Sequence, residues 1–229
     1  MEDKKSVFWS HSRLKDDFLE LKEAIMNVAG SGWPLVSRLV LDRLRKARLL
    51  HYKAVWYSYV TDRELRSMIV SQTALPRLYR LLPRRVRFAS LEGSDALVFL
   101  GKPPEQIYRF VRISPSRFKC TCEDAIMMTS IAERRLNKIL ESLGVKAHVP
   151  AGSLSDYSLC KHTLSEIARA KRAGVLDFEE KEFRNTLTVA LLVLALKYLD
   201  EQEVKKKMLE LVLRAVRTVL ERAGGKAAR

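Results

Sequence analysis

All three cysteines of this chain belong to two short pairs of the kind that binds metal ions. Cys120 and Cys122 form a C-x-C pair in "FKCTCED", and Cys160 forms a C-x-H pair with His162 in "LCKH". Thiolate sulfur and imidazole nitrogen are ligands that Zn²⁺ prefers, and a tetrahedral set of three cysteines and one histidine is a common structural zinc site. The sequence therefore predicts one structural Zn²⁺ held by Cys120, Cys122, Cys160 and His162.

The spacing within each pair suits a shared ion. Residues i and i+2 of an extended chain face the same side, so Cys120 and Cys122 can reach one metal together. Cys160 is expected at the start of a helix, whose N-terminus favours a thiolate. Four protein ligands leave no open position, which favours a structural role over a catalytic one. The alternatives are cysteines that are simply buried, or an iron–sulfur cluster, although two short pairs fit a single ion better.

The pattern C-x-C followed by C-x-H, after a β-hairpin and before a helix, resembles a SWIM-type zinc finger. The matching residues are those in "RFKCTC" and "LCKHTL", and the resemblance covers about residues 105–173. It implies zinc binding in a ββα arrangement and a role in binding DNA or protein, without enzymatic activity. Such fingers occur in transposases, chromatin remodellers, ubiquitin ligases and the recombination mediators of the Shu complex. In this chain the two pairs are separated by an additional predicted helix, at about residues 124–143.

The chain is strongly basic, with 42 lysines and arginines against 27 acidic residues and a formal net charge of +15. A charge of this size favours polyanionic partners. The segment "PRLYRLLPRRVRF" contains arginines, which can bind phosphates bidentately, together with Tyr79 and Phe88, whose rings could stack on bases. We expect a nucleic-acid interface, DNA more than RNA, at Arg77, Arg80, Arg84, Arg85 and Arg87. The alternative is a solvated arginine face with Phe88 in the core.

Several classes of function find no support in the residues. Neither a phosphate-binding glycine loop nor the zinc deaminase pattern occurs, and the paired carboxylates stand where helices should begin. We therefore expect no catalytic residues, no enzyme and no small-molecule substrate. The longest apolar run, Val189 to Leu196, is too short to span a membrane, and the charged start shows no secretory signal. These features predict a cytoplasmic protein without membrane contact, and scarce Asn and Gln suggest a thermophile.

Hydrophobic periodicity predicts a predominantly α-helical α+β fold. Helices are expected over 12–29 and from Pro34 to about Tyr59, and Thr61 to Glu64 read as the capping box of another helix. An alternative places a helix-turn-helix at 61–82 with a wing at 86–100. Two β-hairpins, at 86–101 and 107–122, should precede helices at 124–143, up to Gly174, at 178–198 and at 201–222.

These elements suggest three regions. They are a helical N-terminal region (1–84), the hairpins with the SWIM-type finger and its helical insertion (85–175), and a C-terminal helical hairpin (176–229). The predicted function is a non-enzymatic nucleic-acid-binding module. The alternative is a protein-interaction adaptor in a DNA recombination or repair complex, as the resemblance to the Shu-complex proteins implies.

Overall fold

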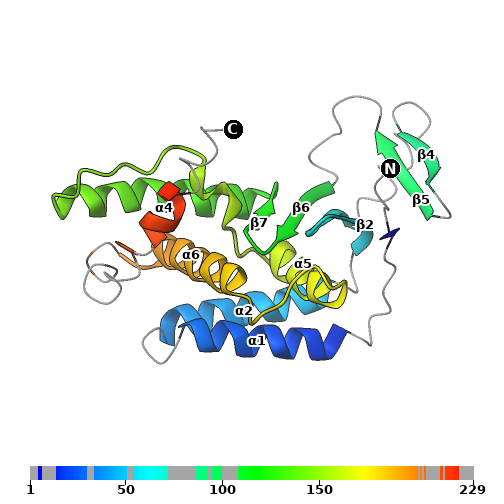
Figure 1. Cartoon of the computed structure of the whole chain (residues 1–229), viewed down its shortest axis with the longest axis horizontal. Helices are drawn as coiled ribbons and strands as arrows, with labels where there is room; N and C mark the ends of the chain where they lie inside the picture. Colours follow the sequence, from blue (N-terminus) through cyan, green and yellow to red (C-terminus); the bar gives the residue numbers. More distant parts are fainter. Residues whose placement is uncertain are drawn as a thin grey trace.

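The computed structural model has a predominantly helical α+β fold, as predicted (Figure 1). It describes residues 5–6, 14–29, 34–50, 54–71, 86–91, 94–99, 108–200, 202, 204, 212–213 and 215–221. The named helices are α1 (Lys15–Ala29), α2 (Pro34–Leu50), α4 (Glu123–Ser142), the 3-10 helix η3 (Ser153–Asp156), α5 (Lys161–Arg172) and α6 (Lys181–Tyr198). The strands are β1 (Lys5–Ser6), β2 (Ala54–Thr61), β3 (Glu64–Ser71), β4 (Val86–Leu91), β5 (Ser94–Phe99), β6 (Tyr108–Ser114) and β7 (Arg117–Cys120).

Helix α6 lies at the centre of the helical part. It contacts α4 on one side and α1 and α2 on the other (Figure 1), and every side chain from Val189 to Leu196 is buried. A helix that is apolar all round must be covered on all sides, and this run is the buried centre of α6. Around it, α1 turns Phe18, Leu21 and Ile25 into the same hydrophobic cluster.

Five strands form one antiparallel sheet in the order β1-β2-β3-β6-β7, and β4 pairs with β5 in a separate two-stranded sheet. The predicted hairpins are therefore both present, as β4–β5 and β6–β7. Alternate residues of β3, β6 and β7 face the helices and are buried, among them Leu65, Val111, Ile113 and Phe118. Helix α5 packs on this face, so the sheet positions it beside the end of β7.

The segment from residue 54 to 71 corrects two predictions. Helix α2 ends at Leu50 and does not continue to Tyr59, because "AVWYSYV" is rich in β-branched and aromatic residues and forms β2. Thr61 to Glu64 is a hairpin turn between β2 and β3, not a capping box, and Asp62 has a left-handed φ of 45° that Asp tolerates well. The region 1–84 is thus not purely helical, and β3 also excludes the helix-turn-helix over residues 64–71.

The predicted helices at 124–143, up to Gly174 and at 178–198 are confirmed as α4, α5 and α6. α4 and α5 end before Gly144 and Gly174, whose positive φ values of 67° and 71° fit the expected glycine caps. The described residues of the predicted helix 201–222 are helical, and Val204, Ala215 and Val219 among them are buried. Within the described part of the chain, none of the helices combines the length and apolar character needed to cross a bilayer.

Candidate metal centre

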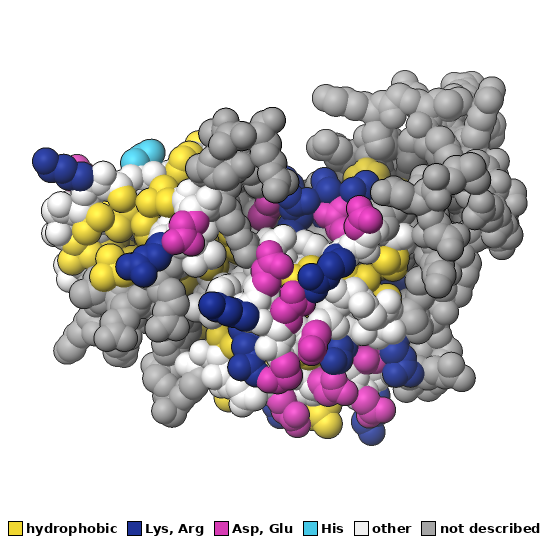
Figure 2. Space-filling model, in the orientation of Figure 1, with side chains coloured by type: hydrophobic (Ala, Val, Ile, Leu, Met, Phe, Trp, Pro, Cys, Tyr) yellow, Lys and Arg dark blue, Asp and Glu magenta, His cyan; other side chains and the backbone are white. Residues whose placement is uncertain are grey.

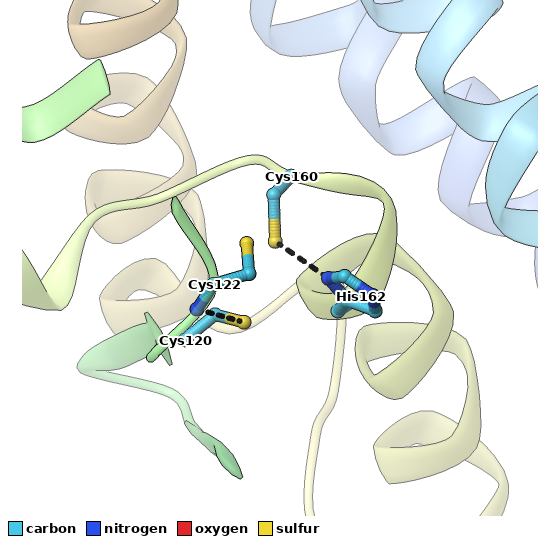
Figure 3. Close-up of side chains that lie close together, drawn as sticks. All are labelled: Cys120, Cys122, Cys160 and His162. Carbon is cyan, nitrogen blue, oxygen red and sulfur yellow. Dashed lines mark hydrogen bonds between the residues drawn. The ribbon is translucent and has the colours of Figure 1, made fainter. Parts of the chain in front are cut away.

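The first ligand pair lies where β7 passes into α4. Cys120 ends β7 opposite Val111, and Cys122 is the N-cap residue of α4 with an extended backbone. Thr121 between them points away, and its hydroxyl accepts a hydrogen bond from the Phe110 amide at 3.0 Å. Cys120 and Cys122 are both buried and present their sulfurs to the same space, as predicted (Figure 3).

The second pair begins α5. Cys160 is the N-cap residue of this helix and is fully buried, and His162 follows in the first turn. The segment before it is tied to β7, because the Ser158 amide and hydroxyl both donate to the Phe118 carbonyl at 2.8 Å. Tyr157 also forms a parallel bridge with Phe118. These contacts join two segments 40 residues apart and bring the second pair to the first.

The four side chains form one compact group. Their ligand atoms all lie within 4.8 Å of one another, and the Sγ of Cys160 is 3.9 Å from Nδ1 of His162 (Figure 3). A tetrahedral Zn²⁺ with ordinary bond lengths requires about 3.8 Å between two sulfurs and about 3.6 Å between sulfur and nitrogen. The group therefore fits a single metal ion after small side-chain adjustments.

Backbone amides already surround the sulfurs in the way that thiolate ligands require. The Cys122 amide donates to Cys120 Sγ, the Ala125 amide to Cys122 Sγ and the Thr163 amide to Cys160 Sγ, each at 3.4 Å. The last two amides lie in the first turns of α4 and α5, so both helix N-termini face the centre. Such hydrogen bonds and helix dipoles favour the anionic form of the ligands and fix their orientation.

The thiol pKa values are split by contacts among the ligands. Burial raises the pKa of Cys160, but hydrogen bonds with Cys120, Cys122 and His162 outweigh it and hold this pKa well below its ordinary value. Hydrogen bonds with Cys122 and Cys160, together with burial, raise the pKa of Cys120 well above its usual range. The hydrogen bond with Cys120 lowers the pKa of Cys122, but Cys160 and burial raise it to about 12. Metal binding must therefore displace protons from Cys120 and Cys122.

An ion-pair network behind the ligands locks the two helix starts together. Arg43 of α2, whose side chain is 11% exposed, binds both carboxylate oxygens of Asp124 at 2.5 and 3.2 Å and the Leu159 carbonyl at 3.2 Å. Lys197 of α6 binds Asp124 at 2.6 Å, and Tyr198 accepts a hydrogen bond from Arg43 at 2.7 Å. Asp124 follows Cys122 in α4, and Leu159 precedes Cys160, so Arg43 connects both ligand pairs.

Sequence reasoning missed this network. It explained the paired carboxylates, Glu123 and Asp124 among them, only by their place at the start of a helix, and it gave Arg43 no role, although a bidentate arginine is a strong positioning group. Burial raises the pKa of Asp124, but hydrogen bonds from Arg43 and Lys197 lower it below its ordinary value, so the carboxylate stays charged. No pattern in the chain relates Arg43 to Asp124, since the two residues are 81 positions apart.

A cavity of about 420 Å³ opens beside the centre. It is lined by three of the four candidate ligands, Cys122, Cys160 and His162, and by charged side chains from several elements. These include Arg43, Lys46, Arg109, Lys161, Asp42 and Asp124. The buried ligand group thus borders a cavity whose other walls are largely charged.

The predicted arginine interface falls almost entirely outside the described residues. Arg77, Arg80, Arg84 and Arg85 lie there, and Arg87 is placed on β4, where its backbone pairs with Val98 of β5. A role for these five arginines stays a prediction.

No protein-family model, no curated protein and no solved structure matches this chain.

Proposed function

We propose that this chain is a SWIM-type zinc finger protein that binds nucleic acid, DNA in preference to RNA, and has no enzymatic activity. The order of elements supports the SWIM type, because the hairpin β6–β7 carries the C-x-C pair and α5 begins with the C-x-H pair. α5 packs on β6 and β7 in a ββα unit, and α4 is the helical insertion between the two pairs.

One observation carries the nucleic-acid part of the proposal: every charged side chain of the hairpin that leads to the candidate metal ligands is basic. Residues 108–120 contain Arg109, Arg112, Arg117 and Lys119 and no acidic residue. Lysine and arginine on a single element are the electrostatic footprint of phosphate binding. By contrast, α1 carries four acidic residues and two lysines, and acidic side chains gather over the lower helical face in Figure 2. The residues of the hairpin therefore carry four positive charges, whereas those of α1 carry a net negative charge.

The ligand set supports a structural role for the metal. Three sulfurs and one imidazole fill the four positions of a tetrahedral Zn²⁺, so neither water nor substrate can bind to the ion. Such an ion contributes folding free energy, on the order of 10 kcal/mol in small zinc-binding peptides at neutral pH. We infer that zinc holds β7, α4 and α5 in place and that binding occurs on the surrounding surface.

Metal analysis and a salt series test this function together. Purified protein should contain one equivalent of zinc per chain. Its affinity for labelled DNA should fall steeply with salt, by a slope of about −0.9 in log K per neutralised phosphate of a duplex and about −0.7 for a single strand. RNA of the same sequence is the parallel arm, and protein stripped of metal is the control. Absence of zinc, or affinity for neither polymer at low salt, would contradict the proposal.

A second candidate function is a protein-interaction adaptor, as in recombination or repair complexes. It is favoured by Ile126 and Met127 on α4, adjacent apolar side chains that are 58% and 49% exposed within two turns of Cys122. Apolar side chains gathered at the surface commonly mark protein contacts. The double variant Ile126→Ser/Met127→Ser should then lose a stoichiometric protein partner in cross-linking, while metal content and nucleic-acid affinity stay unchanged.

A further inference from the structure

The face of the five-stranded sheet opposite the helices carries a row of basic side chains. Arg66 of β3 pairs with Arg112 of β6, and Arg112 pairs with Lys119 of β7. Their side chains are 42%, 41% and 43% exposed. Like charges directly opposite each other destabilise a sheet, so this cation row requires a counter-ion. Neighbouring strands are about 4.8 Å apart, and the row therefore extends about 10 Å across the sheet.

Glu64 holds the arginines of this face in fixed positions. Its carboxylate accepts from Nε of Arg66 at 2.5 Å, from Nε and Nη2 of Arg112 at 3.0 and 2.9 Å, and from Nη1 of Arg117 at 3.1 Å. Burial raises the pKa of Glu64, but the hydrogen bonds from Arg112 and Arg66 lower it below its ordinary value. One ionised carboxylate thus orients three guanidinium groups, which reduces the entropy that they would lose on binding an anion.

The carboxylates do not balance the charge of this face. Asp156 pairs with Arg117 at 3.2 Å and with Lys119 at 3.6 Å, so among the described residues of this face two acidic groups stand against four basic ones. In Figure 2, basic and acidic side chains lie side by side over β6 and β7. The remaining positive charge is complementary to phosphate.

An exposed aromatic ring lies beside the cation row. Phe110 is two residues before Arg112 in β6, so both side chains face the same side of the sheet, and Phe110 is 42% exposed. Met68, its cross-strand partner on β3, is buried. An exposed ring next to fixed cations is the combination that binds single strands, because a base can stack on the ring while phosphates contact the cations.

We propose that this face binds single-stranded nucleic acid, with phosphates on Arg66, Arg112 and Lys119 and a base stacked on Phe110. The inference rests on the proposed function and specifies its surface and the form of the polymer. A duplex keeps its bases stacked inside and offers no base face to Phe110, whereas a single strand can turn one out. The Cys₃His centre supports this surface, because Cys120 directly follows Lys119 and ends the same strand.

Fluorescence anisotropy of the zinc-loaded full chain tests the surface, with a labelled single-stranded DNA, the same RNA sequence and the DNA duplex over a salt series. Arg112→Gln/Lys119→Gln should reduce the salt slope for single strands by about 1.4, because two phosphate contacts are lost. Phe110→Ala should weaken single-strand binding about 5- to 150-fold at constant slope, because stacking does not involve counter-ions.

Matched controls lie on α1, away from the sheet. Lys15→Gln/Lys22→Gln removes the same charge, and Leu19→Ala truncates a side chain that is 54% exposed. Neither should change the slope or affinity. Zinc content and circular dichroism of every variant show whether it is folded.

The outcomes separate the two proposals. If the wild-type chain binds with a salt-dependent affinity but the sheet variants match the α1 controls, the surface is wrong and the proposed function stands. If duplex DNA binds as tightly as single strands and Phe110→Ala has no effect, the single-strand assignment is wrong. If the wild-type chain binds no nucleic acid at low salt, both proposals fail.

Discussion

A buried carboxyl group, Glu166 of α5, should make the stability of this protein depend on pH. The side chain is fully buried between α5 and the β2–β3 hairpin. One carboxylate oxygen accepts a hydrogen bond from the Ser67 hydroxyl, and the other lies 3.2 Å from Nε of Arg169 without a hydrogen bond. Burial raises the pKa of Glu166 from 4.5 to about 7, although the charge of Arg169 opposes this shift.

The size and the sign of the effect follow from linkage. One pKa unit corresponds to 1.36 kcal/mol, so a shift from 4.5 to about 7 changes the free energy of unfolding by about 3 kcal/mol. The folded state binds the proton more tightly than the unfolded state. The protonated carboxyl therefore stabilises the fold fully below pH 4.5, and this contribution is lost as the pH rises through about 7.

Urea denaturation of the zinc-loaded protein at about pH 5 and about pH 8 measures this contribution. Because acid also weakens metal binding, the informative quantity is the difference between wild type and Glu166→Gln at each pH. The free energy of unfolding of the variant minus that of the wild type should be larger at the higher pH than at the lower pH by about 2–3 kcal/mol. Glu141→Gln, an exposed carboxyl of α4, is the matched control and should show no such difference. If the stability difference between Glu166→Gln and wild type is the same at both pH values, the pKa of Glu166 is not raised.

Three further predictions concern the metal centre and the hairpin turn. Cys160→Ser should reduce the zinc content from one equivalent to near zero and lower the melting temperature strongly, as measured by atomic absorption and circular dichroism. Arg43→Met should weaken zinc binding about 10- to 100-fold in competition with a chelator, whereas Lys46→Met, which removes an exposed ion pair on the same helix, should leave it unchanged. Unchanged zinc affinity in Arg43→Met would exclude a positioning role. Asp62→Val should lower stability by about 1–2 kcal/mol in thermal unfolding because valine resists the left-handed φ, and Asp62→Gly should not.

Local patterns identified much of the fold. The helices α1, α4, α5 and α6 and the hairpins β4–β5 and β6–β7 were predicted because each has a clear period, a turn or a glycine cap within its own residues. The β2–β3 hairpin was missed because "TDRE" satisfies the pattern of a capping box as well as that of a two-residue turn. The turn forms because the residues on either side of it are strand-forming and β3 pairs with β6. A local sequence pattern does not contain this pairing.

The sequence by itself identified the candidate metal ligands, because cysteine and histidine are rare in this chain and two i, i+2 pairs restrict which atoms can meet. It also determined the central helix and the basic character of the chain. Only the tertiary structure showed three contacts that matter here. Ser158 donates hydrogen bonds to the Phe118 carbonyl, which brings the two Cys/His pairs together. Arg43 binds residues at the starts of both α4 and α5, and Glu64 binds three arginines on one face of the sheet. The physical reason is distance along the chain, because the contacts of Ser158 and Arg43 join residues 40 to 116 positions apart. The contacts of Glu64 depend on which strands pair, and a local sequence pattern does not contain that information.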